Sequence, residues 1–283
     1  MKRFSPKQME VLRWWRQDGY DAVICDGAVR SGKTYAMTLS FFLWAMTRFR
    51  GKRFGLCAPT KEGVRRNVLA PVRALLEALG VQWEERTSRG ELSVRYGGRE
   101  NHFYLFGGRN EASAALIQGV TLAGVLLDEV ALMPRSFVEQ ACARCSEAGS
   151  KLWFSCNPAG PEHWFYREWV LGAEEKRAQY IHFTMADNPA LSDRVRQRYE
   201  RMFQGTFTSG LCWASGWRPR DWYTISSTRR SCLQFQMAPL PSGVFLATTG
   251  RATPPPLGCG DRRTEYGTES GSSTTTPGRR GGR

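Results

Sequence analysis

The stretch that decides the fold is "CDGAVRSGKTY", Cys25–Tyr35, in which a glycine, four further residues and Gly-Lys-Thr follow one another. It matches the pattern G-x-x-x-x-G-K-[ST], whose glycines let backbone N–H groups curl around a phosphate. A short apolar run at 21–26 precedes the loop and a helical segment starting at Lys33 follows it. Short patterns also match by chance, but a strand before the loop and a helix after it are what phosphate binding requires. The stretch therefore predicts a nucleotide-binding loop formed by Gly27, Ala28, Val29, Arg30, Ser31, Gly32, Lys33 and Thr34.

Two residues of this loop have defined tasks in ATP binding. The Lys33 ammonium can reach the β- and γ-phosphates, and the Thr34 hydroxyl can ligate Mg²⁺. A second acidic site is needed, and the apolar run "AGVLLDE" (123–129) provides Asp128 and Glu129 where a buried strand ends. Asp128 is predicted to hold Mg²⁺ and Glu129 to polarise the attacking water. An apolar run followed by Asp-Glu is common, and an ordinary acidic strand end before a turn has the same pattern, so the run alone decides little; together with the loop, it indicates an ATPase.

Strands and helices alternate through the first 207 residues, which predicts a mostly parallel sheet covered by helices on both faces. Expected strands are 21–26, 53–59, 91–96, 101–106, 123–129, 151–158 and 179–185, with helices at 6–17, 33–48, 61–79, 135–147 and 162–170. The run at 53–59 falls between the two motifs in the sequence. That leaves room for an extra strand between the loop strand and the acidic strand, as in the RecA-like additional-strand P-loop ATPases. The predicted fold class is accordingly α/β.

Four further side chains are candidates for the same site. Ser155 and Asn157 end the strand "KLWFSCNP" and are candidates for sensing the γ-phosphate, although an Asn-Pro turn explains them equally well. Gln8 in "FSPKQ" is placed to read adenine, or else is a surface residue. Arg30 either stabilises charge on the γ-phosphate in cis or faces solvent or DNA.

The charge balance favours a polyanionic partner. The 283 residues contain 40 Lys and Arg against 26 Asp and Glu, a net charge of +14, which points to nucleic acid before membrane. The longest apolar run, "AMTLSFFLWAM" (36–46), is too short to span a bilayer and predicts a buried helix. The eight cysteines are scattered and no signal peptide is recognisable, so a reducing compartment is expected.

Several segments together resemble the large terminase subunit of tailed bacteriophages, of the PBSX-like kind. They are "FSPKQ", "GAVRSGKT", "CAPTKEGVRRNVL", "IQGVTLAGVLLDEV", "FSCNPAGPEHWFY" and "ADNPAL", in order over about residues 4–207. The resemblance implies an ATPase motor at 1–207 that drives double-stranded viral DNA into a procapsid. Lys33, Thr34 and Asp128 would bind MgATP, Glu129 would be the catalytic carboxylate, and the segment containing Ser155 and Asn157 would couple hydrolysis to movement.

The same resemblance implies partners and a location. The motor would act as a homo-oligomeric ring with the phage portal and the small terminase subunit, in the bacterial host cytoplasm at the procapsid portal. Two alternatives remain open at this point. The chain is otherwise another RecA-like, DNA-stimulated ATPase such as a helicase, or a nucleotide-binding remnant without motor activity.

The composition changes after Phe207. Residues 208–283 contain ten Arg but no Lys, Asn or His, and stretches such as "RATPPPLGCG" (251–260) cannot build a core. The family normally continues into an RNase H-like nuclease with a two-metal carboxylate cluster, which this chain does not show. We expect a disordered tail at 208–283 and no endonuclease activity.

A frameshift explains this break. If one base is missing after the Phe207 codon, "TSGLCWASGWRPRDWYTISS" (208–227) can be restored to an apolar, strand-like sequence. In the same shifted frame, "LATTGRATPPPLGCG" (246–260) permits a segment like the first nuclease motif of terminases, with its metal-binding Asp encoded across Ala247 and Thr248. The alternative is a natural Arg-rich tail that binds DNA. The nucleotide sequence of the gene across codon 207 distinguishes the two.

Overall fold

The computed structural model describes residues 4–157 and 160–202. The tail at 208–283 and its predicted disorder lie outside these residues. The strands are β1 (Ala22–Gly27), β2 (Arg53–Ala58), β3 (Gln82–Arg86), β4 (Glu91–Tyr96), β5 (Arg99–Gly107), β6 (Gly124–Leu127), β7 (Lys151–Ser155) and β8 (Ala178–Phe183). The α-helices are α1 (Pro6–Arg13), α2 (Lys33–Arg48), α3 (Lys61–Gly63), α4 (Ala70–Ala78), α5 (Arg135–Ala143) and α6 (Asp193–Met202).

The strands form one sheet in the order β3-β4-β5-β2-β6-β7-β1-β8. Neighbours from β5 to β8 are parallel, whereas β3-β4 and β4-β5 are antiparallel. The mostly parallel sheet is confirmed, and the predicted strands at 91–96 and 101–106 form an antiparallel hairpin as β4 and β5. β3 was not expected, because its residues are largely exposed and show no apolar run.

An additional strand does separate the loop strand from the acidic strand, as expected, but it is not the run at 53–59 from which it was predicted. It is β7, which pairs with both β1 and β6. β2, which lies between the two motifs in the sequence, pairs with β6 on its other side. The arrangement brings the carboxyl ends of β1, β7 and β6 together at one edge, where ligands of open α/β sheets bind.

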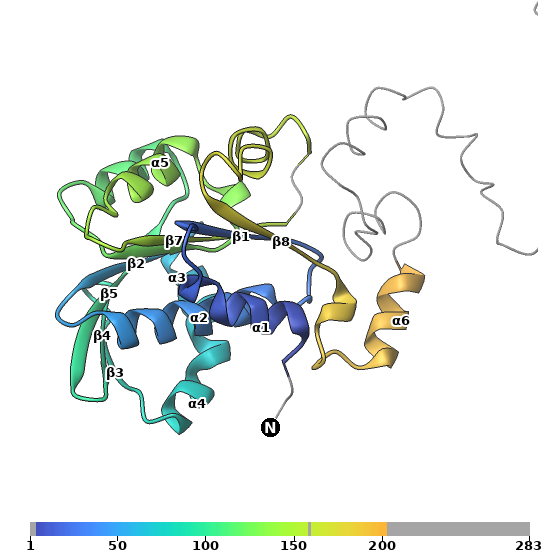
Figure 1. The fold of residues 1–283 in the computed structure, drawn as a ribbon, viewed down its shortest axis with the longest axis horizontal. Helices are drawn as coiled ribbons and strands as arrows, with labels where there is room; N and C mark the ends of the chain where they lie inside the picture. Colours follow the sequence, from blue (N-terminus) through green and yellow to red (C-terminus); the bar gives the residue numbers. More distant parts are fainter. Residues whose placement is uncertain (1–3, 158–159, 203–283) are drawn as a thin grey trace, which may run out of the picture. The chain divides into compact units, whose positions relative to one another are not determined.

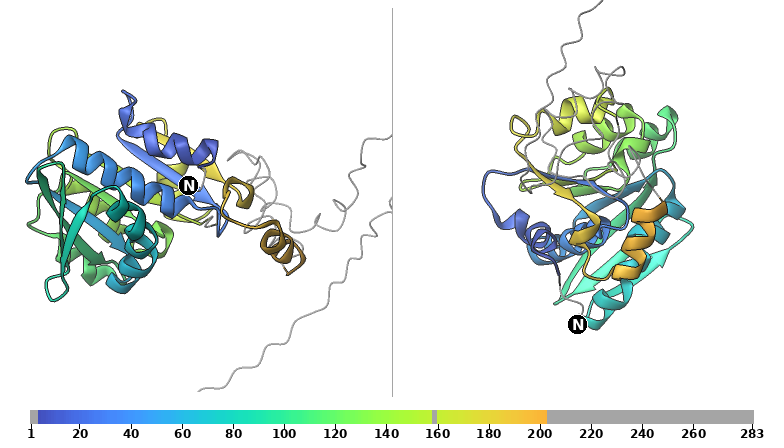
Figure 2. Two further views of the ribbon diagram at one scale, coloured as in Figure 1. Left: turned by 90° about the horizontal axis from the view of Figure 1, so that it is seen from below. Right: turned by 90° about the vertical axis from the view of Figure 1, so that its right-hand side faces the viewer.

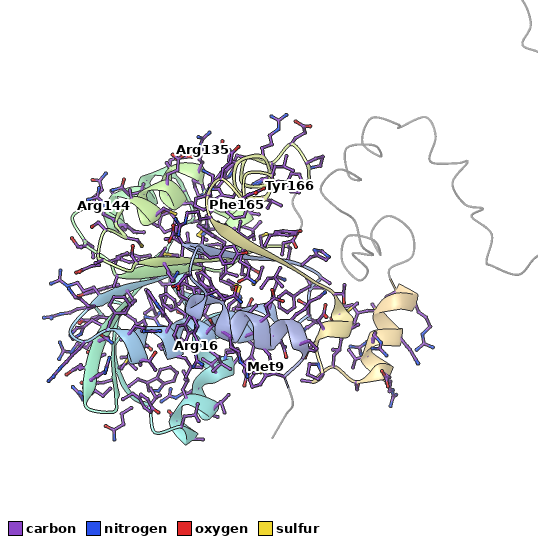
Figure 3. All side chains as sticks on the ribbon, in the orientation of Figure 1. Met9, Arg16, Arg135, Arg144, Phe165 and Tyr166 are labelled. Carbon is purple, nitrogen blue, oxygen red and sulfur yellow. The ribbon has the colours of Figure 1, made fainter. Side chains whose placement is uncertain are left out.

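Helices cover both faces of the sheet (Figure 1). α1, α2 and α4 pack on one face, and α5 with the π-helix Tyr166–Val170 packs on the other. Figure 2 shows the same two layers from the side and from below. Figure 3 places Met9 and Arg16 with the first layer, and Arg135 and Phe165 with the second.

The predicted buried helix at 33–48 is confirmed as α2. Its Phe41 and Trp44 pack edge-on or tilted against Trp153 of β7 and Phe54 of β2, with ring centroids 4.7–5.8 Å apart. Aromatic pairs at such distances add to the free energy of burial. These rings pack the second half of α2 against the central strands and so hold in place the helix that begins at the phosphate loop.

Two predicted helices differ in form. The segment 61–79 is α3, then a π-helix at Val64–Leu69, then α4 with Pro71 in its first turn. Pro71 has no N–H to donate, which the first turn of a helix tolerates because the N–H groups there have no partner within the helix. The segment 162–170 ends in the π-helix Tyr166–Val170. Among the described helices, none combines the length and apolarity that crossing a bilayer requires.

Candidate nucleotide site

The predicted phosphate loop connects β1 to α2 and has the backbone of an anion cradle. Gly27 has φ 120° and Gly32 has φ 81°, both in the region that favours glycine. A Cβ on Gly27 would lie 2.0 Å from the Phe183 carbonyl oxygen of β8, so only glycine fits at position 27. The loop then enters α2 directly at Lys33, so the positive end of the helix faces the same space.

The Lys33 side chain folds back into this loop. Its Nζ donates to the carbonyl oxygens of Gly27 at 3.3 Å and Ala28 at 3.2 Å, and to Asn157 Oδ1 at 2.7 Å. Only 7% of the residue is exposed, and this burial lowers the pKa of the ammonium, while nearby acidic groups including Asp128 oppose the shift. A desolvated cation held inside the loop is suited to bind an anion.

Thr34, Asp128 and Ser155 converge on one point. Asp128 Oδ1 accepts from the Thr34 hydroxyl at 2.9 Å and from the Ser155 hydroxyl at 2.8 Å. Asp128 is 2% exposed, and burial raises the pKa of its carboxyl, while the two hydroxyl hydrogen bonds lower it. Asp128 therefore meets two hydroxyls that are 94 and 27 positions away in the sequence. They come together where β6 and β7 end and α2 begins.

These oxygens fit a hard cation. The described residues contain no cluster of three or more His, Cys, Asp and Glu side chains that would hold a metal by themselves. A hydroxyl and a single carboxylate, completed by phosphate oxygens, are the donors that Mg²⁺ takes at nucleotide sites. Thr34 and Asp128 therefore remain the predicted ligands.

Glu129 follows Asp128 at the end of β6 in a left-handed conformation, φ 57° and ψ 44°. This conformation is uncommon for a residue other than glycine, and such strain is concentrated at functional sites. Partial burial raises the pKa of the carboxyl, and the Asp128 charge raises it further. The residue is neither fully buried nor fully exposed, as a group that meets both a nucleotide and water must be.

Ser155 and Asn157 both reach the site, through Asp128 and Lys33 respectively. The alternative of an Asn-Pro turn at the end of β7 does not by itself explain these two contacts. Gln8 is 3% exposed, so the surface alternative for this residue is wrong. Its Oε1 accepts from Ser5 N–H in the capping box of α1, and its Nε2 lies 2.6 Å from where a Cβ on Gly32 would be. The contact with adenine stays a prediction.

Arg30 lies on the exposed side of the loop with φ 61°. Its carbonyl oxygen accepts from Asn188 Nδ2 at 2.6 Å. No described residue forms a hydrogen bond or ion pair with its guanidinium, which leaves the group available for a ligand. Ser31, the next residue, is 1% exposed, and its hydroxyl has no partner among the described residues.

Asn188 is the residue that sequence reasoning missed. Asn188 belongs to the family-like segment "ADNPAL" (186–191), but the sequence gives no sign of its contact with the loop. The only signal was that pattern itself, because the segment is separated from Arg30 by 158 positions.

The family match covers most of the segment 1–207. A family model described as "Phage terminase large subunit" matches residues 21–208. The large terminase of a thermophilic bacteriophage is 46% identical, with a TM-score of 0.72, over 75% of this chain and 53% of that chain. A structure of the same protein in complex with ADP is 45% identical, with a TM-score of 0.70, over 74% and 52%.

The large terminase ATPase domain of Thermus phage P74-26 has a TM-score of 0.56 at 18% identity, over 74% of this chain and 92% of that chain, and shares the fold. No curated protein matches the chain. The chain spans about half the length of the thermophilic phage terminase that it matches.

Proposed function

We propose, because this chain belongs to the family of phage terminase large subunits, that it is the ATP-hydrolysing motor part of such a subunit, which drives viral double-stranded DNA into the procapsid. The observation that carries the proposal is the convergence of Thr34, Asp128 and Ser155 on one oxygen, beside Lys33 and Asn157. The large terminase of the thermophilic bacteriophage has structures in complex with ADP and with ATP-gamma-S, which supports nucleotide as the ligand here.

Each residue has a part in the proposed mechanism. Lys33 and the loop N–H groups bind the phosphates, and Gln8 contacts adenine. When bound through Thr34 and Asp128, Mg²⁺ would neutralise charge on the β- and γ-phosphate oxygens. Glu129 orients and polarises the attacking water. Ser155 and Asn157 couple the state of the γ-phosphate to the strand β7, since they touch the metal ligand and the phosphate-binding lysine.

The wider assembly follows from the family. We propose that the motor works as a homo-oligomeric ring at the procapsid portal in the host cytoplasm, with the portal protein and the small terminase subunit as partners. We also propose that residues 208–283 replace the nuclease domain through a frameshift. This chain therefore hydrolyses ATP but does not cut DNA, and without a docked second domain it does not package DNA by itself.

The proposal is tested with the purified full chain. We expect ATP turnover that rises when linear double-stranded DNA is added, together with binding to the portal ring of the cognate phage. No Mg²⁺-dependent cleavage of the DNA is expected. DNA-stimulated turnover without portal binding would instead favour a helicase-like ATPase. Nucleotide binding without turnover would indicate an inactive remnant.

The role of Arg30 is tested by Arg30→Ala. If the guanidinium meets charge that develops on the γ-phosphate, kcat should fall about 10- to 10³-fold while the Kd for ATP changes less than about threefold. Alanine is as disfavoured as arginine at φ 61°, so the backbone strain is matched between the two chains. Single-turnover kinetics and equilibrium titration separate the two effects. If the variant and the parent chain hydrolyse ATP at the same rate, the Arg30 guanidinium does not act on the γ-phosphate and instead faces solvent or DNA.

A further inference from the structure

The outer side of the phosphate loop is held by a single segment, residues 183–188, which begins at the last residue of β8. The Ala28 N–H donates to the Phe183 carbonyl at 2.9 Å, and Asn188 Nδ2 donates to the Arg30 carbonyl at 2.6 Å. Asn188 Cγ also lies 3.4 Å from where a Cβ on Gly32 would be. The start, the middle and the end of the loop are therefore all backed by residues 183–188.

The Asn188 carboxamide is itself fixed at both ends. Its Oδ1 accepts from the Ala190 N–H at 3.0 Å while its Nδ2 donates to Arg30. The preceding Asp187 accepts from the Thr184 N–H at 2.7 Å and from Lys7 Nζ at 3.0 Å. The segment is thus tied to α1, and the amide can present only its donor to the loop.

The hydrogen bond acts on the most strained part of the loop. Arg30 has φ 61°, which a side chain other than glycine, asparagine or aspartate rarely adopts unless its surroundings impose it. The Arg30 carbonyl and the Ser31 N–H belong to one trans peptide, so they point in opposite directions. With the carbonyl held by Asn188 on the outside, the Ser31 N–H faces the other side of the loop.

We propose that Asn188 is a positioning residue for the phosphate cradle. By holding the Arg30 carbonyl, it keeps the peptide between Arg30 and Ser31 turned so that its N–H is available to a nucleotide phosphate. The inference rests on the proposed function, since it needs a phosphate to be bound in this loop. It concerns the diphosphate part of the ligand, because the N–H groups of such loops contact the α- and β-phosphates.

The experiment measures ADP binding to the full chain by calorimetry. Asn188→Ala should weaken binding about tenfold, as expected for the loss of one hydrogen bond that orients a binding group. Asn188→Asp has the same shape but places an acceptor against the Arg30 carbonyl, so it should weaken binding at least as much. Asn110→Asp is the matched control, because Asn110 caps a 3-10 helix as an acceptor, which aspartate also does. The control should bind ADP as the parent does.

A double-mutant cycle with Arg30→Gly separates positioning from general destabilisation. Glycine adopts φ 61° without strain, so the effect of Asn188→Ala should shrink to about threefold or less in that background. The same loss in both backgrounds, or parental affinity in Asn188→Ala, would overturn the proposal. Failure of the parent chain itself to bind ADP would instead overturn the proposed function.

Discussion

Lys33→Ala should raise the Kd for ATP and for ADP about 10²-fold or more. The Lys33 ammonium is the one cation that lies inside the loop in the described part of the chain, where it bonds to two loop carbonyls and to Asn157. Charge-assisted hydrogen bonds to a phosphate are worth about 1.5–3 kcal/mol each, and the lysine is expected to make more than one. Calorimetric titration with ADP gives the affinity directly.

Lys52→Ala is the matched control for this loss. Lys52 pairs with Glu147 at 2.7 Å and precedes β2, so it lies at the opposite edge of the sheet from the carboxyl ends. Removing this cation changes the net charge equally but should leave ADP affinity within about twofold of the parent. If Lys33→Ala binds no worse than Lys52→Ala, the loop does not bind nucleotide phosphates.

Glu129→Gln should bind ATP with near-parental affinity but hydrolyse it about 10²- to 10⁴-fold more slowly. The amide keeps the shape of the side chain and its left-handed backbone, but it is a poor base. Steady-state turnover and a separate binding titration measure the two quantities. Glu139→Gln, an exposed change on α5 that breaks the pair with Arg135, should turn over as the parent does. Parental turnover in Glu129→Gln would make this assignment of the catalytic carboxylate wrong.

The pH dependence of turnover gives a second readout for Glu129. Burial first, and the Asp128 charge second, raise the pKa of the Glu129 carboxyl above its ordinary value. A base with a raised pKa stays protonated to a higher pH, so kcat should begin to fall at a higher pH than for an ordinary glutamate as the solution is acidified. The acidic limb should be absent from the residual turnover of Glu129→Gln.

The loop and the acidic strand end could be predicted because their chemistry is local. Gly27, Gly32, Lys33 and Thr34 are neighbours in the chain, and their spacing alone sets the turn into α2. An apolar run that ends in Asp128 and Glu129 likewise carries its own signal. Other properties had no local signal, among them the exposed β3 and the π-helix at Val64–Leu69, because they depend on hydrogen bonds and packing that neighbouring residues do not encode.

The sequence by itself determined the class of fold, the phosphate loop and the two carboxylates, because each depends on residues within a few positions of one another. Only the tertiary structure decided that β7 lies between β1 and β6, and hence that Ser155 meets Asp128 and Asn157 meets Lys33. It also decided that Gln8 is buried against the loop and that Asn188 holds Arg30. The order of parallel strands is set by how long crossovers pack across the sheet, and that packing brings together side chains that no spacing in the sequence relates.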